Sequence, residues 1–120
     1  MAKVKIAFPT EKGGLDDVVY DRLGRTPTFT IVEADTETGE ILDVKIVKNP
    51  GYEAGSGAGV KAAQVIADAG ATVYAGPNPG PNAYAALQYF KVKVIPGYVG
   101  LPVREAVKKV LEELRKEEQG

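Results

Sequence analysis

The sequence predicts an α/β domain whose mixed five-stranded sheet carries three helices, in the order βββαβαβα. Two observations lead to this fold class. The first three predicted strands follow one another with only short connections, which favours antiparallel neighbours, whereas each of the last two follows a helical segment, which favours parallel crossovers. All 120 residues are expected to form a single domain, since a chain of this length can bury a sufficient core.

Large apolar residues alternate with lysine or alanine over residues 3–8 and predict the first strand, which Pro9 should end. Residues 10–26 are glycine-containing and are expected to form an irregular loop with one helical turn around residues 17–22. Residues 28–34 are rich in β-branched and aromatic residues and predict the second strand. A turn over residues 35–39 should then join it to a third strand over residues 41–47, as an antiparallel hairpin.

A loop over residues 49–57 leads to a helix over residues 58–69, whose apolar residues recur at helical spacing and which Gly70 should end. Short apolar runs at residues 72–75 and 92–95 predict two buried strands.

Between these strands, a rigid proline-rich loop precedes a helix from about Asn82 to Phe90. Pro102 suits the first turn of a last helix with one apolar face.

The composition excludes several kinds of chemistry. The chain has no cysteine and no histidine, so it lacks disulfides, thiolate ligands and the usual neutral-pH base. Fifteen basic and sixteen acidic residues nearly cancel, which predicts neither a nucleic-acid nor a membrane partner. Without an apolar run long enough for a membrane span or signal segment, we expect a cytoplasmic protein. The Lys/Glu-rich surface and scarcity of labile residues suggest a thermophilic source.

The glycine-rich loop Gly55-Ser56-Gly57-Ala58-Gly59 is the best candidate ligand site. Its glycines let backbone approach a ligand, and amides before a helix N-terminus point donors at negative charge. The alternative is a flexible connector whose glycines only permit turns. The loop matches neither the dinucleotide fingerprint nor the phosphate-binding loop of nucleotide hydrolases.

Two further segments could complete an anion site. Asn78, Gly80 and Asn82 lie in the proline-rich loop after the fourth strand, where ligands of α/β sheets gather; the alternative is a stiff loop with Asn82 as a helix cap.

Arg22 and Arg25 flank Gly24, and their guanidinium groups could hold an oxyanion. A surface salt bridge with Asp16, Asp17 or Asp21 is the alternative.

Five segments together resemble the family that carries and assembles the iron–molybdenum cofactor of nitrogenase. They are spread in order along the chain: Ile6-Ala7-Phe8-Pro9-Thr10, Leu23-Gly24-Arg25-Thr26-Pro27, Gly55-Ser56-Gly57-Ala58-Gly59, Gly76-x-x-x-Gly80-Pro81-Asn82-Ala83 and Val103-Arg104-Glu105-Ala106-Val107. The resemblance implies a ribonuclease-H-like fold and a metal–sulfur cluster of the iron–molybdenum type as ligand. Family members often carry histidines where this chain has Arg22 and Ser56, so direct metal coordination by these residues is not expected.

We therefore predict a non-catalytic binding or carrier protein for an anionic ligand or cluster, with a protein partner in cluster assembly. The alternative is an interaction or regulatory module of the same fold that has lost its cluster. An enzyme of unknown chemistry is the third hypothesis. Nuclease activity, which the fold can support elsewhere, is not expected because the first strand offers no carboxylate.

Overall fold

A computed structural model describes residues 2–53 and 57–119. It contains strands β1 (Lys3–Thr10), β2 (Thr28–Asp35), β3 (Ile41–Lys48), β4 (Val73–Gly76) and β5 (Lys93–Pro96), helices α1 (Ala58–Asp68), α2 (Pro81–Tyr89) and α3 (Val103–Gln119), and the 3-10 helix η1 (Pro50–Glu53). The sheet order is β3-β2-β1-β4-β5. The pairs β1–β2 and β2–β3 are antiparallel, whereas β1–β4 and β4–β5 are parallel. The predicted mixed sheet is confirmed, and its order agrees with a ribonuclease-H-like arrangement.

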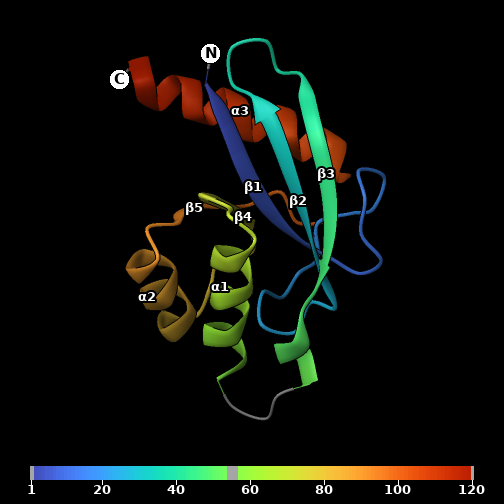
Figure 1. The fold of residues 1–120 in the computed structure, drawn as a ribbon, viewed down its shortest axis with the longest axis vertical. Coiled ribbons are helices and arrows are strands. Elements are labelled where there is room, and N and C mark those ends of the chain that lie inside the picture. Colours follow the sequence, from blue (N-terminus) through green and yellow to red (C-terminus); the bar gives the residue numbers. More distant parts are fainter. Residues whose placement is uncertain (1, 54–56, 120) are drawn as a thin grey trace.

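The helices cover the two faces of the sheet unequally. Helix α3 lies across one face, while α1 and α2 pack together on the other (Figure 1). The alternation of β1 follows this division: Ile6 and Phe8 join the cluster under α3, whereas Ala7 joins the cluster under α1 and α2. In β4, Tyr74 faces α1 and α2 while its neighbours face α3. Both clusters consist of buried apolar and aromatic residues, so the sheet is buried by helices on each side.

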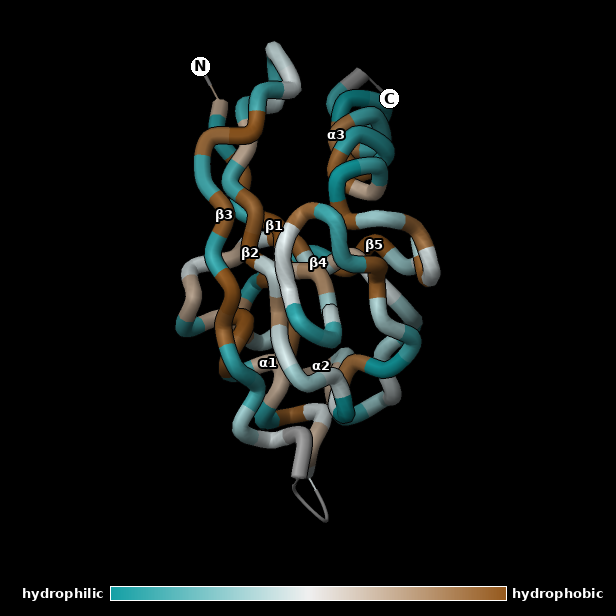
Figure 2. The backbone as a smooth tube through the Cα atoms, turned by 90° about the vertical axis from the view of Figure 1, so that its right-hand side faces the viewer, coloured by the Kyte–Doolittle hydropathy of each residue, from teal (hydrophilic) through white to brown (hydrophobic). Residues whose placement is uncertain are grey.

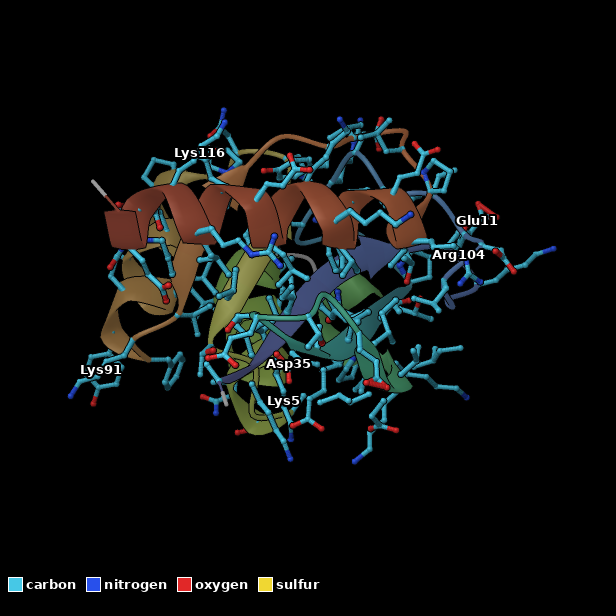
Figure 3. The ribbon with its side chains drawn as sticks, turned by 90° about the horizontal axis from the view of Figure 1, so that it is seen from above. Lys5, Glu11, Asp35, Lys91, Arg104 and Lys116 are labelled. Atoms are coloured by element: carbon cyan, nitrogen blue, oxygen red, sulfur yellow. The ribbon has the colours of Figure 1, made fainter. Side chains whose placement is uncertain are left out.

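Helix α3 shows the amphipathic pattern that the sequence predicts. Its apolar stripe turns toward the sheet while its outer face is hydrophilic (Figure 2). Five residues of this stripe are buried and Leu114 is partly buried against the same cluster; the five are Val103, Ala106, Val107, Val110 and Leu111. Seen from above, Arg104 and Glu11 lie at one end of α3, with Lys116 near the other (Figure 3).

The start of α3 also explains why the predicted helical turn at residues 17–22 is wrong. Val103 and Arg104 donate their backbone N–H groups to the carbonyl oxygens of Asp17 and Leu15, at 2.8 and 2.9 Å. Val19 in turn donates to the Leu101 carbonyl at 2.9 Å. An extended segment here satisfies the free amides of the first helical turn, so tertiary contacts outweigh local helix propensity.

The expectation that Pro9 ends the first strand is also wrong, because β1 continues through Thr10. The carbonyl oxygen of Pro9 accepts the N–H of Tyr20 at 2.8 Å. The N and C=O of one strand residue face the same edge, so the missing Pro9 N–H faces away from β2. The β1–β4 ladder covers only the pairs Ile6–Val73 and Ala7–Tyr74, so it has ended before Pro9 and loses no hydrogen bond there.

The turns agree closely with the sequence. Gly39 adopts a φ of 80° in the β2–β3 hairpin, where Asp35 Oδ1 accepts the N–H groups of Glu37 and Thr38. Gly70 ends α1 with a φ of 82° and donates to the carbonyl of Ala67. Across the described residues, no helix is both long enough and apolar enough to span a membrane.

Candidate functional site

The candidate site lies at the end of the molecule where α1 begins, beside the loops that follow β1 and β4 (Figure 1). Parallel strands direct their carboxyl ends to one edge of a sheet, and ligands of α/β folds gather there. The chain enters α1 through Gly57, whose φ of 74° is left-handed and suits glycine. Gly57 is exposed, and its carbonyl accepts the N–H of Lys61 at 3.0 Å.

Gly24 packs directly on the first turn of α1. A Cβ placed on Gly24 would lie 3.2 Å from the backbone N of Gly59 and 3.3 Å from the carbonyl carbon of Ala58. These separations leave little space for a side chain. The loop that carries Arg22 and Arg25 therefore rests against the N-terminus of α1.

Gly59 makes an equally close contact with α2. A Cβ on Gly59 would lie only 2.8 Å from the Cβ of Ala83, in the first turn of α2. The three segments that the sequence singled out thus meet around two helix beginnings. This proximity depends on glycine at both Gly24 and Gly59.

Neither helix N-terminus is capped by a side chain. The N-cap residues are Gly57 for α1 and Gly80 for α2, and the first turns of both helices contain no acidic residue. Asn82, which the sequence offered as a possible cap, instead follows Pro81 inside the helix and is exposed. Uncapped first-turn amides carry partial positive charge and are suited to an anion.

The remaining predicted residues have different surroundings. Arg22, Arg25 and Asn78 are exposed. Gly55 and Ser56 lie outside the described residues, so the structure gives no information on that part of the glycine-rich loop.

The sequence offered Asp16, Asp17 and Asp21 as salt-bridge partners of Arg22 and Arg25. In the structure, Asp16 and Asp17 have other partners. Asp16 pairs with Arg104 at 3.2 Å. The Asp17 carboxylate accepts backbone N–H groups at 2.8–3.1 Å: Glu11, Lys12, Gly13 and Val18.

These contacts make Asp17 the centre of the loop after β1. Burial alone would raise the pKa of its carboxyl, but the four backbone hydrogen bonds outweigh burial and lower the pKa below the ordinary value of 3.8. Asp17 thus fixes the loop as an ionised group. This role was not predicted from the sequence.

A threonine network holds the same end of β1. The Thr10 hydroxyl lies 2.7 Å from that of Thr28 and 3.0 Å from that of Thr30, and Thr26 Oγ1 donates to the Thr10 carbonyl at 2.6 Å. Thr10, Thr26 and Thr30 are fully buried. Their mutual hydrogen bonds satisfy these buried hydroxyls and join the segment before Thr28 to the end of β1.

Asn49 is a buried polar residue that sequence reasoning missed. Asn49 is 2% exposed, and its Nδ2 donates to the carbonyls of Thr26 at 2.9 Å and Gly24 at 3.4 Å. Its Oδ1 accepts the N–H of Gly51 at 3.2 Å. One side chain therefore joins the loop carrying Gly24 to the start of η1.

Tyr74 is a second missed residue. It is fully buried, and its hydroxyl donates to the carbonyl of Pro77 at 2.7 Å. Burial raises the pKa of this phenol well above its usual value of 10.0, so Tyr74 remains a hydrogen-bond donor. The bond holds the first residue of the loop that leads to Gly80 and α2.

The side chains at the site suit hydrogen bonding to an anion better than metal coordination. Within the described ranges, no three or more Asp or Glu side chains gather as a potential metal site, and the sequence contains no His or Cys. Backbone N–H groups and guanidinium groups donate hydrogen bonds but have no lone pair to offer a metal.

Comparisons with known proteins agree with this reading of the fold. A family model described as dinitrogenase iron-molybdenum cofactor matches residues 2–113. The structure is similar to the apo form of the orange protein from Desulfovibrio gigas, with 37% identity, a TM-score of 0.81 and coverage of 91% of this chain and 88% of that chain. It is also similar to a Thermotoga NifB-like protein of the DUF35 family, with 32% identity, a TM-score of 0.69 and the same coverage of 91% and 88%.

The chain belongs to the dinitrogenase iron–molybdenum cofactor family. PH0822, another solved structure, shares 22% identity over 92% of each chain with a TM-score of 0.74, and supports the fold alone. No protein with a curated function matches the chain.

Proposed function

We propose that this protein is a non-catalytic carrier of an anionic metal–sulfur cluster or cluster precursor. The observation that carries the proposal is that the uncapped N-termini of α1 and α2 lie side by side. Gly59 of α1 packs closely on Ala83 of α2, and Gly24 packs on the first turn of α1. Family membership supports the choice of cluster as cargo, since the matching family is described by the iron–molybdenum cofactor.

The cargo would be held as a whole anion. The proposed contacts are the first-turn amides of α1 and those of α2 that follow Pro81, which itself has no N–H, together with the side chains of Asn78 and Asn82 and the guanidinium groups of Arg22 and Arg25. Gly55 and Ser56 remain part of the proposal as sequence predictions. Charge-assisted hydrogen bonds to several donors can hold an oxyanion or thioanion without a metal–protein bond.

Because the chain has no histidine or cysteine to bind a metal, a second function is also proposed. A module of the same fold that has lost its cluster and acts through a protein partner would need no anion affinity. A cytoplasmic location and a partner in cluster assembly remain predictions of the carrier hypothesis.

Anaerobic reconstitution separates the two functions. The chain is incubated with iron, molybdate and sulfide, desalted, and analysed for bound metal. The carrier hypothesis predicts coloured protein with stoichiometric metal, and its loss in an R22Q/R25Q variant. A K108Q/K109Q variant, which removes the same charge from exposed positions on α3, should retain the metal. Colourless, metal-free wild-type protein would contradict the carrier hypothesis and favour the interaction module.

A further inference from the structure

The buried Asn49 side chain connects segments that are far apart in the sequence. It follows β3 directly, and its backbone N–H donates to the carbonyl of Pro27 at 3.0 Å. With the side-chain bonds to Gly24, Thr26 and Gly51, this gives Asn49 four contacts with the two chain segments on either side of it. A residue that is 2% exposed and whose side chain forms three of these hydrogen bonds can occupy only one position.

The contacts continue from Asn49 into the candidate site. Nδ2 of Asn49 reaches the carbonyl of Gly24, and the other side of Gly24 rests on Ala58 and Gly59. On the opposite flank, Oδ1 holds Gly51, and a Cβ on Gly51 would lie 2.8 Å from the Cβ of Lys61 in α1. Asn49 therefore contacts both chain segments that border the N-terminus of α1.

We propose that Asn49 is a positioning residue for the anion site, which fixes the Gly24 loop against the first turn of α1 without touching the ligand itself. This inference rests on the proposed carrier function, because it assigns Asn49 a role in that site. Asparagine suits the role because one amide group donates to carbonyls on one side and accepts an N–H on the other. An aspartate could replace the acceptor but not the donor.

The chain supplies a matched control at the opposite end of the β2–β3 hairpin. Asp35 is 3% exposed, and its Oδ1 accepts the backbone N–H groups of Glu37 and Thr38 at 2.8 and 3.1 Å. Both Asn49 and Asp35 are buried side chains that fix a turn at the end of a strand. Only Asn49 contacts the candidate site.

The test compares N49A, N49D and D35A by thermal unfolding and by titration with molybdate, well below each unfolding midpoint. All three variants should lose stability. We expect the Kd for molybdate to rise about tenfold in N49A and N49D, and to stay within about twofold of wild type in D35A. N49D keeps the acceptor for Gly51 and removes only the donor, and its unfolding midpoint shows whether it is folded at the titration temperature.

Equal affinity in wild type and N49D, or an equal loss of affinity in D35A, would overturn the positioning role. A wild-type chain that does not bind molybdate would instead contradict the proposed function. In that case, backbone amide NMR shifts still test whether Asn49 positions Gly24 against Gly59. N49D should shift the amides of Gly24 and Gly59 together, and unchanged shifts at both would overturn the inference.

Discussion

The close approach of α1 and α2 makes G59A the most informative single substitution. The new Cβ would lie 2.8 Å from the Cβ of Ala83, where carbon atoms in contact prefer roughly 3.5–4.0 Å. Both residues belong to rigid first turns, and Ala83 is buried. The overlap can be relieved only by moving the two helices apart.

The expected change in the free energy of unfolding of G59A follows from two opposing effects. Overpacking a core position costs about 1–3 kcal/mol, while replacing glycine by alanine in a helix gains about 0.5–1 kcal/mol. We therefore expect G59A to lower the free energy of unfolding by about 1–2 kcal/mol. For a chain of 120 residues, with an unfolding entropy of roughly 2.1 cal/mol/K per residue, the midpoint should fall by about 4–8 °C.

Urea unfolding of four proteins measures the interaction energy between positions 59 and 83. The proteins are wild type, G59A, A83G and G59A/A83G. The double variant moves the single methyl group from one helix to the other, so it should recover much of the stability that G59A loses. The expected interaction energy between the two positions is about 1 kcal/mol or more. A G59A variant as stable as wild type, or strictly additive losses in the double variant, would refute the proposed close packing of the helices.

Three further predictions concern the loops around the site. Y74F removes the hydroxyl that holds the loop after β4 and should destabilise the fold by about 1–2 kcal/mol in urea unfolding; no loss would show that this bond is dispensable. The pKa of the Asp17 carboxyl is lowered in the folded chain, so its ionised form stabilises the fold above about pH 3.8 and this contribution is lost on further acidification. The stability difference between wild type and D17N should therefore shrink from pH 7 to pH 2, and a constant difference would contradict the role of ionised Asp17. G13A and G14A both place alanine at positive φ, but only at Gly13 would the new Cβ meet Ile46, at 2.5 Å. G13A should therefore unfold at a lower temperature than G14A. Equal unfolding midpoints would exclude this clash.

The sequence was sufficient for the fold because its signals are local and repeated. Alternation in β1, the apolar stripe of α3 and glycines such as Gly39 and Gly70 each reflect the conformation of a few neighbouring residues. The order of strands then follows from which connections contain a helix. The errors arose where distant residues decide the local conformation, as for Pro9, whose missing N–H faces an edge that β4 does not reach.

The site was predictable only as a set of separate segments. Glycine patterns identified Gly24 and the start of α1, but nothing in the local sequence indicates that Gly24 lies on Gly59, or Gly59 on Ala83. Asn49 precedes a proline and resembles an ordinary turn residue. Its contacts with Thr26 span 23 positions of sequence, and only the folded chain brings these residues together.

The central claim is that an anion binds where α1 and α2 begin, and amide NMR during a molybdate titration of the ¹⁵N-labelled protein tests it most directly. We predict saturable shifts of the amides of Ala58, Gly59 and Ala83. The hairpin turn between β2 and β3 and helix α3 lie at the other end of the molecule (Figure 1). The amide signals of Thr38 in that turn and of Glu112 in α3 should not shift. Saturable shifts confined to the hairpin end, or an absence of shifts at both helix N-termini, would contradict the claim.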